Sequence, residues 1–130
     1  MDNLDKYYTK DKVAEHCVDV VKRFYDISKY DIVEPSAGGG AFLPYLPNYT
    51  AYDILPENKN IIKQDFLKLK LEYSDKRMFI GNPPFGRRSK LSIEFFNHAA
   101  TMGSIIAFII PITWLKYSVQ NALNKDFKLV

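Results

Sequence analysis

Short apolar runs alternate along this chain with segments in which apolar residues recur every three or four positions. The second pattern predicts a helix over residues 10–27, in which Thr9 or Asp11 caps the N-terminus. Its apolar positions are Val13, Cys17, Val20, Val21 and Phe24. The same spacing predicts a helix over residues 89–102, with one side formed by Leu91, Phe95, Phe96 and Ala99.

The short apolar runs predict five strands, at residues 31–33, 49–52, 60–63, 78–80 and 104–110. A short helix at 41–45 is interrupted by Pro44, and a last helix at 117–125 precedes residues 127–130, which look like the start of a sixth strand. Strands that alternate with helices predict a mostly parallel α/β sheet with helices on both faces. The run at 104–110 carries no charge, which is typical of a covered central strand.

Polar side chains follow four of these predicted strands. Glu34 ends the first strand, Asp53 the second and Asp65 the third, and Asn82 comes just after the fourth. The carboxyl ends of parallel strands form the edge at which ligands bind in such sheets. We therefore expect these four residues to belong to one site.

The turn after the fourth strand reads Gly81-Asn82-Pro83-Pro84-Phe85-Gly86. Two prolines remove backbone donors and hold the turn extended, so it offers mainly carbonyl acceptors. Asn82 adds a side-chain carbonyl and Phe85 a flat aromatic face. Acceptors beside a ring suit an amino group on a flat ring, such as the exocyclic amine of a nucleobase.

The loop after the first strand contains Gly38-Gly39-Gly40, which allows close approach to a ligand. It matches neither the dinucleotide pattern, whose third glycine would fall at Leu43, nor a phosphate loop. Asp53 stands where an acid takes ribose hydroxyls, and Asp65 and Phe66 suit an adenine amine and ring. Together they indicate a nucleoside that carries an amino acid, namely S-adenosylmethionine.

Two motifs resemble the S-adenosylmethionine-dependent amino-methyltransferases that act on N6 of adenine. Residues 34–40 look like their cofactor loop, and Asn82-Pro-Pro-Phe85 looks like their catalytic motif. The cofactor loop precedes the catalytic motif, and this order matches one subgroup of the family. The resemblance covers roughly residues 7–130 and implies a Rossmann-like methyltransferase sheet. It implies catalytic roles for Asn82, Pro83, Pro84 and Phe85. The cofactor residues that it implies, together with those above, are Tyr8, Thr9, Glu34, Pro35, Ser36, Ala37, Gly38, Gly40, Asp53, Ile54, Asp65, Phe66 and Asn82. Residues 7–10, Tyr-Tyr-Thr-Lys, resemble the family's motif that contacts the methionine end of the cofactor. Lys10 stands where that motif usually has the proline of Thr-Pro.

The resemblance implies direct methyl transfer to adenine N6 in DNA, without a metal. Asn82 and the Pro83 carbonyl would accept the two amino hydrogens, and Phe85 would stack on the flipped base. Arg87, Arg88 and Lys90 would either hold phosphates or form a solvated loop. RNA is the alternative substrate, and a non-catalytic cofactor-binding subunit is the alternative from another class. Glutamine-methylating relatives fit less well, because they resemble Asn-Pro-Pro-Tyr.

Length and composition bound these expectations. The length of 130 residues indicates one domain. The net charge of +3 permits a nucleic-acid partner without requiring one. Five strands would be incomplete relative to the family's usual seven, with no target-recognition domain. An apolar edge strand then predicts a homodimer or a separate recognition subunit. The polar start and single cysteine favour a soluble, cytoplasmic chain without a membrane partner. We expect Trp114 to pack in the core.

Overall fold

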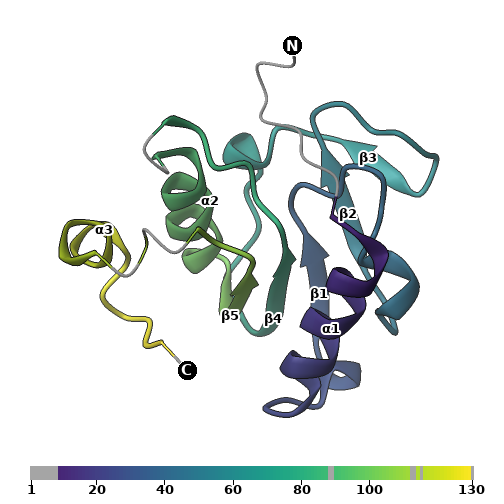
Figure 1. Ribbon diagram of the computed structural model, residues 1–130, viewed down its shortest axis with the longest axis horizontal. Helices are drawn as coiled ribbons and strands as arrows, with labels where there is room; N and C mark the ends of the chain where they lie inside the picture. Colours follow the sequence, from purple (N-terminus) through teal and green to yellow (C-terminus); the bar gives the residue numbers. More distant parts are fainter. Residues whose placement is uncertain (1–8, 88–89, 112–113, 115, 130) are drawn as a thin grey trace.

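The computed structural model describes residues 9–87, 90–111, 114 and 116–129. These form a five-stranded, wholly parallel sheet of Rossmann-like order, β3-β2-β1-β4-β5 (Figure 1). The strands are β1 (Asp31–Glu34), β2 (Thr50–Asp53), β3 (Ile61–Lys63), β4 (Ser74–Gly81) and β5 (Gly103–Phe108). The prediction of a parallel α/β sheet with about five strands is confirmed.

The strand order reverses between β1 and β4. From β1 the chain builds β2 and β3 on one side, and it then crosses back to place β4 and β5 on the other. β1 and β4 are hydrogen-bonded neighbours, with Ile32 opposite Met78. Such a reversal opens a crevice at the carboxyl ends of the two strands, where ligands of open α/β sheets bind. The fold therefore places the ends of β1 and β4 at the favoured position for a site.

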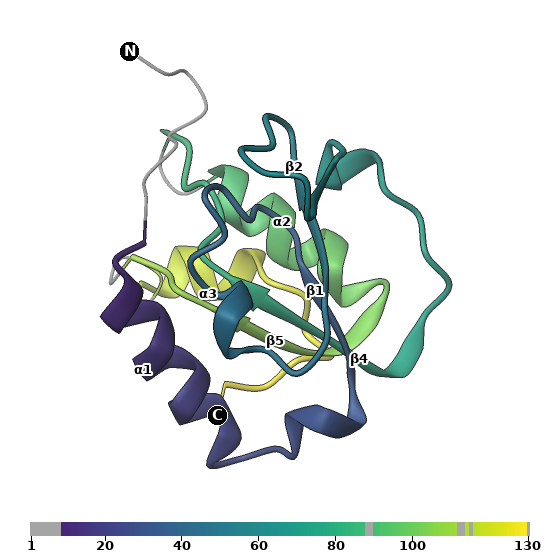
Figure 2. The ribbon, with the colours of Figure 1, turned by 90° about the vertical axis from the view of Figure 1, so that its right-hand side faces the viewer.

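Two apolar clusters cover the two faces of the sheet. Helix α1 (Asp11–Lys22) contributes Ala14 and Val18 to the cluster that contains Ile32, Met78 and Ile80. Helix α2 (Lys90–Ala100) contributes Phe95 and Ala99 to the opposite cluster, with Val33 and Phe79. Neighbouring residues of β4 thus point to opposite faces, as alternation along a strand requires. The expectation of helices on both faces is confirmed, although the helices are few (Figure 2).

Helix α1 is shorter than predicted at its C-terminal end and is capped differently. It ends at Lys22 rather than at residue 27, because Asp26 begins a separate 3-10 turn by accepting from the Ser28 amide. Phe24 is consequently 59% exposed and not part of the apolar side. The residue that precedes the helix is Lys10, which makes no side-chain capping bond, so neither Thr9 nor Asp11 acts as the cap.

The bounds of other helices and strands also differ from those predicted. The predicted helix at 41–45 is a single 3-10 turn, Leu43–Tyr45. Strand β4 begins at Ser74, earlier than the apolar run indicated, and β5 ends at Phe108. The last helix, α3, spans Tyr117–Ala122. Trp114 is 2% exposed and donates from Nε1 to Ser92 Oγ at 3.3 Å, so its predicted place in the core is confirmed.

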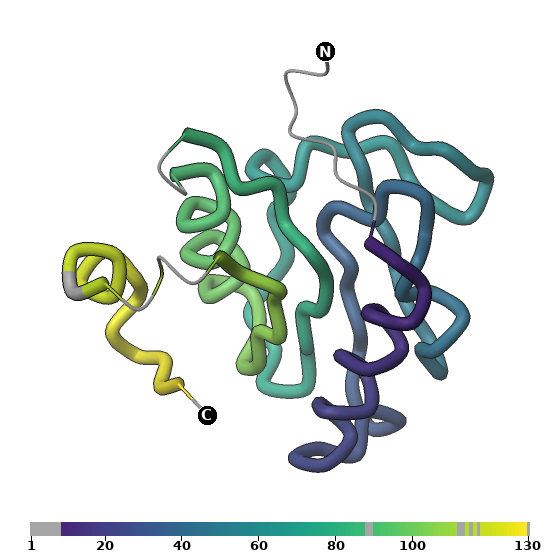
Figure 3. Tube along the Cα trace, viewed as in Figure 1, coloured from purple at the N-terminus to yellow at the C-terminus, as the bar shows by residue number. Residues whose placement is uncertain are grey.

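The last residues do not form the expected sixth strand. Residues 127–129 have no strand structure, and Val130 lies outside the described residues. Phe127 instead packs edge-on against Phe96, with ring centroids 5.7 Å apart. Figure 3 shows the chain leaving α3 without joining the sheet, so β5 is an edge strand of the described sheet. An apolar groove of about 680 Å³ runs beside β5, between α1 and the last residues.

Candidate functional site

A pocket of about 350 Å³ lies at the carboxyl ends of β1 and β4. This volume falls within the usual range for small-ligand sites, about 300–1,000 Å³. Its wall combines the loop after β1, the turn after β4 and the start of α1. The lining residues are Thr9, Asp11, Glu34, Ser36, Ala37, Gly38, Gly39, Gly40, Ala41, Phe42, Pro44 and Asn82. The reversal of strand order has thus brought together two motifs that are far apart in the sequence.

The glycine loop is held by the neighbouring strand β2. The Ala37 amide donates to the Tyr52 carbonyl at 2.8 Å, and the Gly38 amide donates to Asp53 Oδ2 at 2.8 Å. Gly38 has a φ of +58°, a left-handed conformation that glycine adopts without the penalty of a Cβ atom. Asp53 is therefore a structural anchor of the loop as well as a candidate ribose acceptor.

Glu34 is a buried carboxyl in the pocket wall. It is 1% exposed, and its Oε1 accepts from the Ser36 amide at 2.9 Å. Gly81 of the adjacent strand lies directly against it, since a Cβ atom on Gly81 would stand 2.7 Å from Oε2. Only glycine at position 81 leaves room for this carboxyl group.

Burial raises the pKa of Glu34 from its ordinary value of 4.5 to about 8. The bond from the Ser36 amide opposes this shift, and the nearby charge of Asp53 adds to it. Burial therefore favours the protonated form of Glu34.

Asn82 presents a buried acceptor that has no partner in the described structure. Its Oδ1 makes no hydrogen bond to any described residue, while its Nδ2 donates to Thr9 Oγ1 at 3.2 Å. The backbone carbonyl of Asn82 accepts from Ser36 Oγ at 3.2 Å, which ties the two motifs together. A buried acceptor left unpaired costs about 1–3 kcal/mol, so this oxygen favours a ligand that donates a hydrogen bond.

The remaining residues of the Asn-Pro-Pro-Phe turn build a rigid corner. Pro83 is fully buried, and Pro84 and Phe85 are half-buried. The Phe85 carbonyl accepts from the Leu91 and Ser92 amides at 3.1 and 3.2 Å, and thereby caps the start of α2. Asn82 is therefore followed directly by a buried proline and, after Pro84, by a phenylalanine whose backbone is anchored to α2.

This pocket is not lined by four of the sequence-predicted cofactor residues, Asp53, Ile54, Asp65 and Phe66. Asp65 accepts from the Leu67 amide through Oδ1 at 3.0 Å, and Ile54 is 42% exposed; both follow strands at the same edge of the sheet. Phe66 is 1% exposed and packs against Phe79 and Phe95. Its predicted place against an adenine ring is therefore wrong for this structure, because the core already covers the ring.

Several predicted residues fall elsewhere, and the pocket holds others that the sequence did not reveal. Pro35 is fully buried beside Glu34, while Tyr8 and Arg88 lie outside the described residues. Asp11, first considered as a helix cap, lines the pocket and accepts from Tyr45 Oη at 2.7 Å. Nothing in the sequence pairs these two residues, since the bond depends on how α1 docks against the loop. The other unpredicted wall residues are Gly39, Ala41, Phe42 and Pro44.

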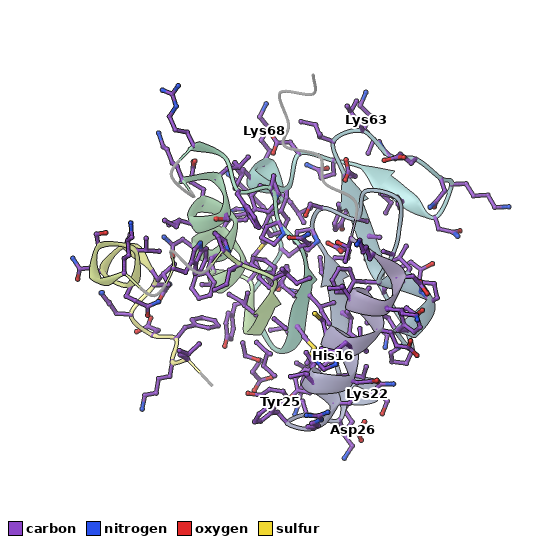
Figure 4. The ribbon with its side chains drawn as sticks, in the orientation of Figure 1. His16, Lys22, Tyr25, Asp26, Lys63 and Lys68 are labelled. Carbon is purple, nitrogen blue, oxygen red and sulfur yellow. The ribbon has the colours of Figure 1, made fainter. Side chains whose placement is uncertain are left out.

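The charges around the site differ between its wall and its surroundings. The ionisable side chains of the pocket wall, among the described residues, are the carboxylic acids Asp11 and Glu34. Outside the wall, Lys63 and Lys68 are exposed and lie at the same end of the molecule, opposite Tyr25 and Asp26 (Figure 4). Arg87 and Lys90 are also exposed beside the Asn-Pro-Pro-Phe turn. This arrangement suits a cationic ligand within and phosphates outside.

A larger depression, of about 760 Å³, lies between the end of α1 and the turn around Pro44. It shares Pro44 with the candidate pocket and includes no unpartnered buried polar atom among the described residues. The 350 Å³ pocket is smaller, but it holds the buried carboxyl of Glu34 and the unpartnered oxygen of Asn82. Its chemistry, rather than its size, makes it the candidate site.

Comparison with known proteins identifies no relative: no family model, curated protein or solved structure matches this chain. Among the described residues, no three His, Cys, Asp or Glu side chains gather as a metal site would require. The described helices are all too short or too polar to cross a membrane. The site must therefore be interpreted from its own geometry.

Proposed function

We propose that this protein is an S-adenosylmethionine-dependent methyltransferase that modifies the N6 amino group of adenine in DNA. The observation that carries the proposal is the buried Oδ1 of Asn82, which has no hydrogen-bond partner among the described residues and lies at the reversal of strand order. It lies on the wall of a pocket that also contains the glycine loop. An exocyclic amine donates hydrogen bonds, so a free acceptor at this place could position it for reaction.

The residues present fit the cofactor's chemistry. The backbone of Gly38 and Gly40 leaves the loop open to close approach, Thr9 offers a hydroxyl, and Asp53 stands at the strand end where an acid would take ribose hydroxyls. The wall lacks lysine and arginine among its described residues, which disfavours a pyrophosphate and favours a cationic sulfonium compound. The bound cofactor would supply an activated methyl group.

The turn would orient the acceptor of the methyl group. Asn82 Oδ1 and the Pro83 carbonyl would accept the two amino hydrogens of adenine and so aim the nitrogen lone pair. Phe85, half-buried at the corner, would stack on the base once it leaves the duplex. The methyl group would pass directly to the nitrogen, so no covalent enzyme intermediate is needed. After transfer, the surplus proton on the nitrogen leaves to solvent.

The exposed cations support a nucleic-acid substrate. Lys63, Lys68, Arg87 and Lys90 surround the carboxyl edge of the sheet without lining the pocket. Contacts to phosphates position a nucleic acid without specifying its sequence. DNA remains the favoured substrate, RNA is the alternative, and a separate recognition subunit would supply sequence specificity.

Transfer of a labelled methyl group from S-adenosylmethionine to pools of DNA, RNA and protein tests the proposal. We expect label in DNA, recovered as N6-methyladenine on nucleoside mass spectrometry, and no label with Asn82→Ala. Asn121→Ala, an exposed asparagine on α3, is the matched control and should retain activity. Label in RNA alone would change the substrate. Cofactor binding without transfer to any pool would favour the non-catalytic subunit.

A further inference from the structure

The wall of the pocket is built to receive positive charge. Glu34, 1% exposed, forms its innermost carboxyl, and Asp11 adds a second carboxylate at the start of α1. Asp53, 7% exposed, lies behind the glycine loop. The unpartnered Oδ1 of Asn82 adds a further acceptor. Electrostatics and hydrogen bonding therefore favour one ligand class, a cation such as a sulfonium or an ammonium.

The same geometry creates a conflict when no cation is present. The groups that act on Glu34 are the Ser36 amide, the carboxylate of Asp53 and the backbone of Gly81, while Asp11 lines the same pocket. Of these, only the Ser36 amide stabilises a negative charge on Glu34. Gly81 brings no side chain and excludes water from the carboxyl, which removes the solvation that an ionised group needs.

We propose that Glu34 holds a proton while the pocket is empty and releases it when a cationic ligand enters. The O–H bond of the carboxyl group breaks, the proton passes to solvent, and the ligand's positive charge takes its place. The raised pKa of Glu34, about 8, agrees with this exchange at physiological pH. The inference rests on the proposed function, because S-adenosylmethionine is the cation that we expect to bind.

Thermodynamic linkage between proton binding and ligand binding gives the size of the effect of pH on affinity. A ligand that binds the ionised form of Glu34 must displace one proton below the pKa of the empty site and none above it. Its dissociation constant should rise by up to about tenfold for each pH unit below 8 and become constant above that value. A neutral ligand in the same pocket would show no such dependence.

Isothermal titration calorimetry of S-adenosylmethionine into the intact protein measures the proton directly. Titrations at pH 7 in buffers of different ionisation enthalpy give the number of protons released per site, and we expect close to one. S-adenosylhomocysteine carries the same amino group without the sulfonium and should release fewer protons. Because both ligands carry this amino group, the difference between their proton counts subtracts any proton exchanged by the amine itself.

Two variants identify the group. Glu34→Gln, which keeps the shape and an acceptor for the Ser36 amide, should remain folded by circular dichroism and bind without proton release. Asp19→Asn removes an exposed carboxylate of α1 that does not line the pocket, and it should release the proton as the wild type does. Binding without proton release, or unchanged release from Glu34→Gln, would overturn the inference and leave the proposed function intact. Failure of the folded wild type to bind the cofactor would contradict both.

Discussion

The side-chain amide of Asn82 donates from Nδ2 to Thr9 Oγ1 at 3.2 Å. This bond joins the segment before α1 to the turn after β4, and Oδ1 of the same amide has no partner within the described part of the chain. Thr9 therefore orients Asn82, because an amide whose nitrogen is held must present its oxygen elsewhere. The two residues form one unit of the candidate site.

Replacing Thr9 by valine should disturb this orientation while preserving the shape of the side chain. Loss of one net hydrogen bond, worth about 0.5–1.5 kcal/mol, should lower the rate of methyl transfer by roughly two- to tenfold. Single-turnover kinetics on methyl-acceptor DNA would measure the change. Thr9→Ser, which keeps the hydroxyl, should be close to wild type, and equal loss in both variants would contradict the orienting role.

Asn82→Ala should abolish transfer and leave cofactor affinity nearly unchanged, because the free oxygen of Asn82 is assigned to the target amine. Calorimetry with S-adenosylmethionine, alongside the transfer assay, separates the two effects. A folded Asn82→Ala protein that no longer binds the cofactor would show that the roles are assigned wrongly.

Phe85→Ala should weaken the hold on the target base. Stacking of a base on an aromatic ring is worth about 1–3 kcal/mol. The Phe85 carbonyl, which caps α2, is backbone and survives the substitution. Fluorescence of 2-aminopurine at the target position should fall as the flipped state is lost. Unchanged fluorescence would place the base elsewhere.

Asp53→Ala should affect both the cofactor and the glycine loop. Its carboxylate holds the Gly38 and Leu55 amides, each at 2.8 Å. Loss of a charged hydrogen bond costs about 1.5–3 kcal/mol, so affinity should fall roughly 10- to 100-fold. Asp53→Asn keeps an acceptor for one amide and should lose less. If calorimetry shows wild-type affinity for Asp53→Ala, Asp53 does not belong to the site.

The dependence of stability on pH should reveal Glu34. Its pKa is raised in the folded state, from 4.5 to about 8, so the folded protein keeps a proton that the unfolded chain has lost. Its contribution to stability is therefore complete below pH 4.5 and declines as the pH rises to 8, by about 1.4 kcal/mol per pH unit.

Urea denaturation of the wild type and Glu34→Gln at several pH values measures this decline. The unfolding free energy of the variant minus that of the wild type should increase as the pH rises. Parallel curves for the two proteins would mean that Glu34 titrates normally.

The free edge of β5 predicts association. Residues 104–110 carry no charge, and all line the apolar groove beside the strand. Such an edge is prone to pairing with another chain. Light scattering should show self-association at micromolar concentration, and Ile110→Lys should reduce it, because it places a charge in the apolar groove just beyond the end of β5. Ile110 belongs to neither core cluster, so the variant should fold. A monomeric wild type would rule out pairing between copies.

The sequence by itself determined the parallel α/β class, the approximate positions of its five strands and the two motifs at strand ends. It could do so because apolar periodicity and proline and glycine positions act locally. It failed where packing decides: α1 ended early, and Phe66 joined the core instead of facing a ligand.

Only the tertiary structure decided the chemistry of the pocket. The close approach of Gly81 to Glu34, the bond from Asn82 to Thr9 and the anchoring of Gly38 by Asp53 all join segments that are distant in the sequence. Burial set the protonation of Glu34, and the reversal of strand order set which loops meet. Neither is encoded in the local pattern, because solvation and long-range contact exist only once the chain has folded.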